Sequence, residues 1–211
     1  SLSNDKIQFK MDIEFKISKN PVNYKKALRL LEKRVNEVKK GGRELVWFLE
    51  HPTTYTAGIR YKKEEILDKS INIVKTNRGG KITLHNPGQK IVYFVLDLNK
   101  RKKNIRNLVR EIENIIVEFL KIYRIKSYAD KKNIGIWVNR KKIAAIGIRV
   151  SRWVAYHGFS ININNDLDDY KKIVPCGLNN EKITSFKKEG KKSLNINKNL
   201  KNIFLKNLPK I

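Results

Sequence analysis

The sequence contains one cysteine, Cys176, which stands between Pro175 and Gly177. Proline restricts the backbone on one side of the thiol and glycine relaxes it on the other, a pattern that suits a sharp, exposed turn. The thiolate is the reactive form of cysteine, and a neighbouring cation lowers the pKa of a thiol toward neutrality. These residues predict covalent chemistry at sulfur. The alternative is an inert buried thiol, which is the ordinary state of an isolated cysteine.

A cation for such a thiol is Lys142, which begins the segment 142–147 (KIAAIG). Desolvation beside an apolar run lowers the pKa of a lysine and makes it useful as a base or as a tuned cation. On spacing alone, a solvated lysine at the end of a strand is the simpler interpretation.

A third segment, 78–89 (RGGKITLHNPGQ), stands out from the lysine-rich background. Paired glycines let a backbone approach a ligand closely, and Arg78, Thr83 and His85 add polar groups beside that approach. A surface hairpin also explains the glycines. Of the other histidines, His51 precedes a proline in a loop, and His157 alternates with apolar residues as a hydrogen-bonded core histidine would; neither is predicted to be catalytic.

These segments need a scaffold, and the apolar pattern predicts one that mixes strands with helices. The expected strands are 12–18, 44–50, 71–74, 91–98, 135–138, 142–150 and 153–163. The expected helices begin at Asn20-Pro21, at 105, at Asp166 and after 193. Because no regular βαβ rhythm appears, we expect an α+β fold with helices packed on a mixed, mainly antiparallel sheet.

The chain has 211 residues and a formal net charge of +27, with one Cys and three His. This length favours a single catalytic domain over 1–211, of which 1–10 are expected to be disordered or of artificial origin. A single cysteine fits a reducing compartment, so we expect a cytoplasmic protein, or an organellar one after loss of a transit peptide. No membrane segment, metal site or cofactor motif is evident. The charge favours acidic partners, although an AT-biased genome explains the lysines as well.

Taken in order, the segments resemble the octanoyl-carrier-protein:protein octanoyltransferases of lipoate biosynthesis, the lipoate-protein ligase B family. The matching stretches are 51–58 (HPTTYTAG), 78–89, 142–147, Arg152-Trp153 with His157-Gly158, Pro175-Cys176-Gly177 and 183–185 (ITS), within roughly residues 45–186. One departure is Asn86, where the family has glycine; if that position needs a positive φ, asparagine is the best replacement.

The resemblance implies a biotin/lipoate protein ligase-like fold, with Cys176 as nucleophile and Lys142 as the partner that lowers its pKa. It also implies a set of substrate-binding residues: Arg78, Gly79, Gly80, Lys81, Ile82, Thr83, Leu84, His85, Ala145, Ile146, Gly147, Gly158, Phe159 and Ser160. The implied donor is octanoyl-acyl carrier protein. The implied acceptors are lipoyl domains of 2-oxoacid dehydrogenase complexes and the glycine cleavage H protein, with no cofactor, nucleic acid or membrane involved.

Two other functions compete with this interpretation. An ATP-dependent lipoate or biotin ligase on the same fold needs the lysine but not the cysteine, so Cys176 argues against it. A nucleic-acid-binding protein is suggested by charge alone, and the sequence carries no recognised binding motif.

Overall fold

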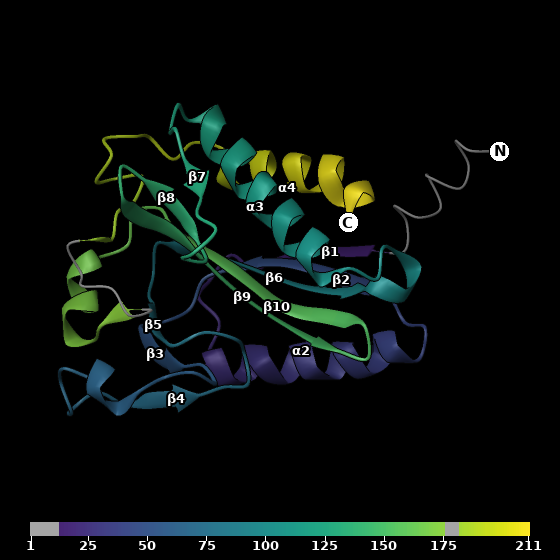
Figure 1. Ribbon diagram of the computed structural model, residues 1–211, viewed down its shortest axis with the longest axis horizontal. Coiled ribbons are helices and arrows are strands. Elements are labelled where there is room, and N and C mark those ends of the chain that lie inside the picture. The colour runs from purple at the N-terminus through teal and green to yellow at the C-terminus, as the bar shows by residue number, and fades with distance from the viewer. Residues whose placement is uncertain (1–12, 176–181) are drawn as a thin grey trace.

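The computed structural model describes residues 13–175 and 182–211. Its main sheet has seven strands in the order β1-β2-β6-β10-β9-β8-β7 (Figure 1). The strands are β1 (Ile13–Ile17), β2 (Glu44–Leu49), β6 (Gln89–Asp97), β7 (Tyr128–Ala129), β8 (Ile136–Val138), β9 (Lys141–Ser151) and β10 (Val154–Asn162). Strands β1 and β2 pair in parallel and every other pair in this sheet is antiparallel, so the predicted mainly antiparallel α+β class is confirmed.

Helices cover both faces of this sheet (Figure 1). Helix α2 (Tyr24–Lys39) packs its apolar stripe on one face, in a buried cluster with alternate residues of β2 and β6. Helices α3 (Ile105–Ile122) and α4 (Ile196–Asn207) cover the other face, where Phe94, Phe119 and Phe204 lie in the larger buried cluster. Because β6 is buried on both faces, its sequence is a nearly continuous apolar run rather than an alternating one.

A second sheet of three short strands, in the order β4-β3-β5, carries the glycine-rich segment. Its strands are β3 (Thr54–Ala57), β4 (Ile73–Lys75) and β5 (Ile82–His85). Tyr55 and Leu84 of this sheet pack with Tyr170, which lies in the 3-10 helix Leu167–Lys172. The apolar contact ties β5 to this 3-10 helix.

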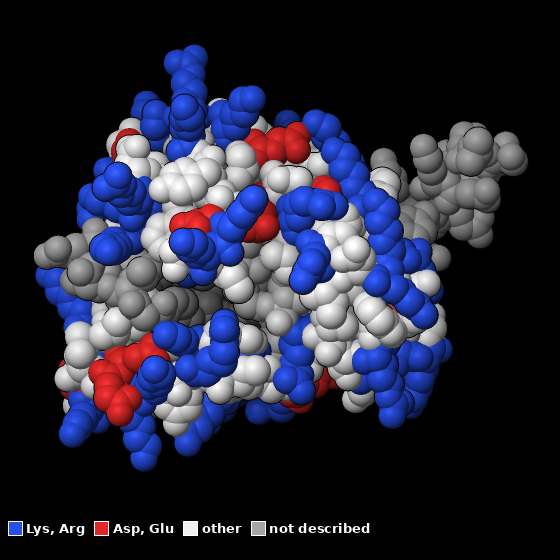
Figure 2. Space-filling view, viewed as in Figure 1, with Lys and Arg blue, Asp and Glu red and all other residues white. Residues whose placement is uncertain are grey.

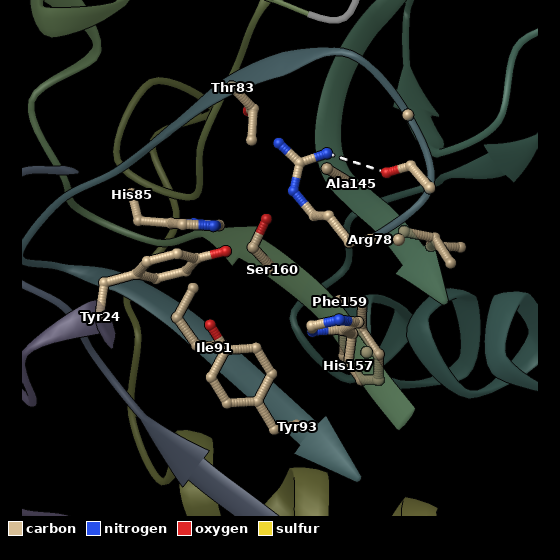
Figure 3. A pocket seen from close by; sticks show the side chains of 15 residues that line it. Tyr24, Arg78, Thr83, His85, Ile91, Tyr93, Ala145, His157, Phe159 and Ser160 are labelled. Carbon is tan, nitrogen blue, oxygen red and sulfur yellow. Dashed lines mark hydrogen bonds between the residues drawn. The ribbon is translucent and has the colours of Figure 1, made fainter. Parts of the chain in front are cut away.

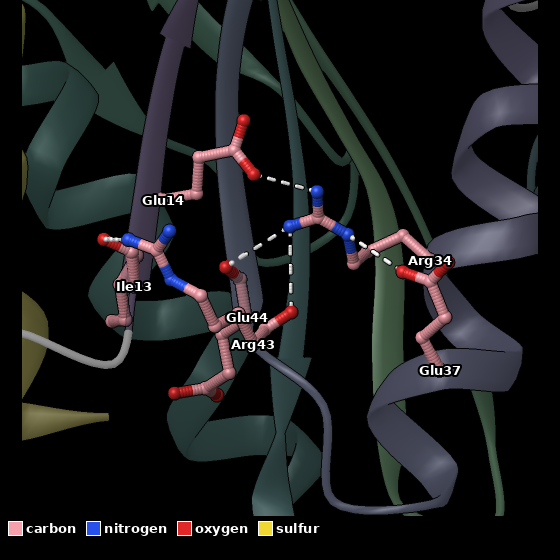
Figure 4. A network of polar contacts seen from close by, with 6 residues as sticks. All are labelled: Ile13, Glu14, Arg34, Glu37, Arg43 and Glu44. Atoms are coloured by element: carbon pink, nitrogen blue, oxygen red, sulfur yellow. Dashed lines mark hydrogen bonds and ion pairs between the residues drawn. The ribbon is translucent and has the colours of Figure 1, made fainter.

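One arginine ties α2 to the edge of the main sheet (Figure 4). The Arg34 guanidinium lies 2.6 Å from Glu14 of β1 and 3.3 Å from Glu37 of its own helix. It also donates to the carbonyl oxygens of Arg43 and Glu44, each at 3.4 Å, where β2 begins. Such an arginine, with its fixed fork of donors, orients three elements at once.

The structure corrects two local predictions. Helix α2 begins at Tyr24 and is capped by Asn23, whose side chain accepts from the Lys26 amide, rather than at Asn20-Pro21. Strands β3 and β5 were not expected, because four residues are too few to show a period. Among the described residues, no helix is both long enough and apolar enough to span a bilayer.

Candidate functional site

A small cavity lies where the second sheet meets β6, β9 and β10 (Figure 3). It encloses about 60 Å³, and its walls combine apolar side chains with bare glycine backbone and a few polar groups. Its lining residues are Tyr24, Arg78, Gly79, Gly80, Thr83, His85, Ile91, Tyr93, Ala145, Ile146, Gly147, His157, Gly158, Phe159 and Ser160. This composition suits an apolar ligand held in orientation by a small number of polar contacts.

Two glycines of the cavity wall face each other across β9 and β10. Gly147 and Gly158 are paired in the strand register. Gly158 has a φ of +154°, and a Cβ there would collide with the carbonyl oxygen of Val92 in β6. A Cβ at Gly147 would meet its nearest neighbours, Arg78 Cδ and the Gly79 carbonyl oxygen, at 3.5 Å. Gly158 is therefore required by the sheet, whereas a Cβ at Gly147 would make only ordinary contacts.

Arg78 organises the loop that forms one wall. Its Nη2 donates to the Thr56 carbonyl at 3.1 Å, to the Thr56 hydroxyl at 2.8 Å and to the Lys81 carbonyl at 2.9 Å. Its Nη1 donates to the carbonyl of Gly79 at 2.9 Å. These bonds fold residues 78–81 against β3, where Gly58 leaves no space for a side chain beside Gly80. The guanidinium is buried and adds positive charge to the cavity wall.

All three histidines of the chain lie in or behind the cavity. His51 donates from Nδ1 to the Val22 carbonyl at 2.6 Å and accepts from the Tyr93 hydroxyl at Nε2, 2.7 Å away. His85 donates from Nδ1 to Oε1 of Gln89 at 2.7 Å. His157 donates from Nε2 to the Asn77 side-chain oxygen at 2.9 Å. In each of the three histidines, one protonated ring nitrogen is enough to make all of these hydrogen bonds. The hydrogen bonds therefore favour the neutral form of each imidazole.

Burial acts in the same direction on each imidazole. Desolvation lowers the pKa of His51 to about 4, against a small opposing effect of the Val22 hydrogen bond. Desolvation, together with the charges of His51 and Arg78, lowers the pKa of His85 to about 3. Desolvation and the charges of Arg78 and Arg149 lower the pKa of His157 to about 4. The cavity therefore presents neutral imidazoles at pH 7.

Lys142 lies at a second, smaller cavity of about 10 Å³ that adjoins the first. The two cavities share Thr83, Ala145 and Ser160 as lining residues. Pro175, the residue directly before Cys176, also lines the smaller cavity. Lys142 is buried, and its backbone carbonyl accepts from the Thr184 amide at 2.9 Å, which ties β9 to the segment that follows residue 181. The structure thus brings Lys142 and Pro175 to one cavity.

Most of the predicted substrate-binding residues line the main cavity, and three do not. Ile82 and Leu84 are fully buried and point into the core of the small sheet, as the alternation along β5 requires. Lys81 lines a neighbouring surface groove instead. Cys176 lies outside the described residues.

Sequence reasoning missed four residues of the cavity wall: Tyr24, Ile91, Tyr93 and His157. His157 is buried and hydrogen-bonded as expected, yet it also faces the cavity. Tyr24 stacks on His85 with ring centroids 5.7 Å apart. Only the fold places the start of α2 beside β5, so no local signal in the sequence marks Tyr24.

The asparagine at position 86 is explained by the hydrogen bonds of its side chain and not by its backbone conformation. Asn86 does not have a positive φ. Its Nδ2 donates to the Asp166 carbonyl at 2.8 Å and to Oδ2 of Asp169 at 3.0 Å, and its Oδ1 accepts from Asn165 at 2.9 Å. These bonds tie the turn after β5 to the 3-10 helix, a contact that glycine lacks.

Residues 23–207 match the family model of the lipoyl protein ligase A/B catalytic domain. The chain belongs to this family. An octanoyltransferase of Anaplasma phagocytophilum (strain HZ) is 45% identical over 188 residues, covering 86% of this chain and 90% of that protein. An octanoyltransferase of Ehrlichia chaffeensis (strain ATCC CRL-10679 / Arkansas) is 46% identical over 185 residues, covering 84% and 86%. The resemblance to lipoate-protein ligase B enzymes is confirmed: the chain is an acyltransferase, and its relatives support octanoyl transfer in lipoylation.

Solved structures confirm the predicted ligase-like fold. A putative lipoate protein ligase from T. acidophilum with bound lipoic acid superposes with a TM-score of 0.76 at 17% identity, covering 92% of this chain and 85% of that chain. An archaeal lipoate protein ligase described with its E2 lipoyl domain gives 0.72 at 16%, covering 92% and 83%. A biotin protein ligase from Leishmania major in complex with biotinyl-5-AMP gives 0.55 at 13%, covering 93% and 72%.

Proposed function

We propose that the chain is a single cytoplasmic catalytic domain that moves an octanoyl group from octanoyl-acyl carrier protein to the acceptor lysine of lipoyl domains. The group travels as a thioester on Cys176. One observation carries the proposal: Lys142 and Pro175 line one cavity, which adjoins the larger cavity whose apolar lining suits an acyl chain. Neither a cofactor nor a metal ion is needed for this exchange.

In the first half-reaction, the Cys176 thiolate attacks the carbonyl carbon of the donor thioester. A carbon–sulfur bond forms to Cys176, and the bond to the pantetheine sulfur breaks. The Lys142 ammonium supplies the proton that the leaving thiolate takes up, so Lys142 ends this step neutral. One thioester replaces another, and the exchange is close to balanced in energy. The acyl chain extends from Lys142 past Ala145 and Ser160 into the main cavity.

In the second half-reaction, the amine of the acceptor lysine attacks the Cys176 thioester. An amide bond forms, the carbon–sulfur bond breaks, and neutral Lys142 accepts the proton that the amine loses. The ammonium and the thiolate are both restored. Conversion of a thioester to an amide runs downhill, which gives the overall transfer its direction.

A groove beside the cavities supports docking of acidic partners. It encloses about 390 Å³ and shares Gly79, Gly80, Ile146 and Gly147 with the main cavity. Lys142 also lines it, together with Arg60, Lys81 and Lys132, and its described lining includes no acidic residue. Figure 2 shows Lys and Arg side chains across the same face, with few acidic ones among them. Such a field raises the encounter rate with an acidic carrier protein or lipoyl domain.

The test is to mix the chain with octanoyl-carrier protein in the absence of ATP and to measure the intact mass under mildly acidic conditions. We expect the mass of one octanoyl group to be added. The adduct should be absent from Cys176→Ala and removable by hydroxylamine or by a lipoyl domain, which becomes octanoylated. Lys142→Ala should form the adduct far more slowly.

Two outcomes overturn the proposal. Octanoylation of the lipoyl domain by Cys176→Ala at the wild-type rate means direct transfer without a thioester. Octanoylation of the lipoyl domain that requires free octanoate and ATP means that the chain catalyses the ATP-dependent ligase reaction instead.

A further inference from the structure

The strand pairing beside Lys142 is irregular. Ile136 of β8 pairs with Ala144 of β9, whereas the next residue, Trp137, pairs with Lys142, so Ile143 is an extra residue on β9. Strict alternation is broken there, because Ile143 and Ala144 both lie in the same buried cluster. A regular strand would place Lys142 on the same face as Ala144, in the apolar core. With the bulge, Lys142 lies at the rim of the core, where it lines both the smaller cavity with Pro175 and the groove with Ile146 and Ile148.

The Lys142 side chain runs over the bare backbone of Gly135. A Cβ at Gly135 would collide with Cε of Lys142, and it would lie 3.2 Å from Nζ and 2.9 Å from the carbonyl oxygen of Ala144. Gly135 has a φ of +133°, which side chains other than hydrogen rarely adopt. Both the space and the backbone conformation at this position therefore require glycine while Lys142 keeps its direction.

The indole of Trp137 borders the ammonium on another side. Nζ of Lys142 lies 5.9 Å from the centroid of the Trp137 ring, within the range of a cation–π contact. The Trp137 Nε1 donates to the carbonyl of Asn133 at 3.1 Å, which fixes the plane of the ring. A buried ammonium near a fixed aromatic face has a restricted set of positions.

We propose that Gly135 and Trp137 are positioning residues that hold the Lys142 ammonium at the cavity lined by Pro175. Gly135 provides the channel for the methylene stem, and Trp137 orients the charged end. The consequence for Cys176 rests on the proposed function, in which Lys142 lowers the pKa of that thiol. The packing of Lys142 itself does not rest on it.

The experiment measures two quantities in a small set of variants: the rate of octanoyl transfer, and the pH dependence of alkylation by iodoacetamide. The chain has a single cysteine, so alkylation reports on Cys176 alone. Lys142→Ala is the reference and should shift the alkylation profile toward that of a free thiol, with a pKa of about 8.5. Gly135→Ala should shift it in the same direction and lower kcat about 100-fold, with KM little changed.

Gly41→Ala is the matched control. Gly41 also has a positive φ, +88°, but a Cβ there meets nothing within 4 Å. It isolates the strain of a left-handed alanine, and it should leave both the alkylation profile and kcat at the wild-type values. Trp137→Phe retains an aromatic face, so its kcat and its alkylation profile should stay close to those of the wild-type chain. In Trp137→Leu both quantities should shift toward the values of Lys142→Ala.

A double variant separates positioning from general damage. Removing the Lys142 stem also removes its collision with the methyl group introduced at position 135, so Gly135→Ala should lower the melting temperature less in the Lys142→Ala background than in the wild-type chain. The transfer rate of the double variant should equal that of Lys142→Ala. Additive losses in both quantities would mean that Gly135 acts independently of Lys142.

The outcomes distinguish the two proposals. If Lys142→Ala leaves the alkylation profile unchanged, Lys142 does not lower the pKa of Cys176 as proposed. The melting temperatures of the Gly135 variants then decide whether Gly135 positions the Lys142 side chain. If Lys142→Ala shifts the profile while Gly135→Ala and Trp137→Leu do not, the positioning role is refuted. Should Gly135→Ala fail to fold, Trp137→Leu decides the question by the same comparison.

Discussion

Replacing His51 with glutamine should flatten the dependence of stability on pH below pH 6.5. His51 is fully buried, and desolvation lowers its pKa from 6.5 to about 4. Between pH 6.5 and about 4, His51 is mostly protonated in the unfolded chain and mostly neutral in the folded chain. The free energy of unfolding therefore falls as pH falls, and the contribution of His51 is fully present only above pH 6.5.

The size of the effect follows from the two pKa values. Between pH 8 and pH 5, a histidine with a pKa of 6.5 unfolded and about 4 folded removes about 2 kcal/mol from the free energy of unfolding. His157 has the same folded value, and His85, at about 3, adds a similar amount in that window. The three histidines together remove about 6 kcal/mol, which is comparable to the whole stability of many domains. We expect the wild-type chain to approach acid unfolding near pH 5.

The assay is urea unfolding, followed by tryptophan fluorescence, of the wild-type chain and His51→Gln at several pH values from 8 to 5. The variant loses the bonds to Val22 and Tyr93, but that loss is nearly independent of pH and cancels when slopes are compared. The wild-type chain should lose about 2 kcal/mol more than the variant between pH 8 and pH 5. Parallel curves would show that His51 is protonated as easily in the folded chain as in the unfolded one.

Three further predictions concern stability and the cavity. Gly158→Ala should lower the free energy of unfolding by more than about 4 kcal/mol or prevent folding, because its Cβ meets the Val92 carbonyl oxygen. Gly147→Ala, across the strand pair, should fold normally but lower kcat/KM. Urea unfolding measures the first effect and the transfer assay the second. Arg101→Met should lower the free energy of unfolding by about 3–5 kcal/mol, because it leaves the buried Glu44 carboxylate without the guanidinium that lies 2.7 Å away. Adding Glu44→Gln should restore part of the melting temperature that Arg101→Met loses. Asn104→Ala should cost about 1 kcal/mol, because its side chain accepts from the Asn107 amide at the start of α3; a chemical denaturation midpoint unchanged from wild type would contradict this.

The sequence predicted the parts of the fold whose apolar pattern is long. Helix α3 and strand β6 follow directly from their periods, because each buries an extended face against its neighbours. Strands β3 and β5 are held instead by pairing with each other and by contact with Tyr170, and such tertiary support leaves no local period. The start of α2 was misplaced because two asparagines, at 20 and 23, offer similar caps, and only Asn23 makes the bond.

The candidate site was predictable where glycines mark it. Gly147 and Gly158 were expected at the site by resemblance; the structure gives a steric reason for Gly158, whereas a Cβ at Gly147 would make only ordinary contacts in the cavity wall. The approach of Lys142 to Pro175 depends on a bulge and on an isolated bridge between Lys142 and Ile183. Irregular pairing of this kind has no signature in residue types. Tyr24 was missed for a related reason, since its place in the wall comes from helix packing.

The walls of the cavity have a consequence for the order in which the molecule is assembled. They come from the start of α2, the loop before β5, and strands β5, β6, β9 and β10, and the adjoining cavity also needs Ile183. Contacts between residues so distant in sequence form only once both segments exist, and the entropy of closing the chain between them is lost before the contacts are gained. While the chain is being synthesised, α2 and the first strands emerge long before the rest of the walls. The cavity is therefore completed only when most of the chain has been made, and a nascent fragment that ends before β10 lacks the wall formed by His157, Gly158, Phe159 and Ser160.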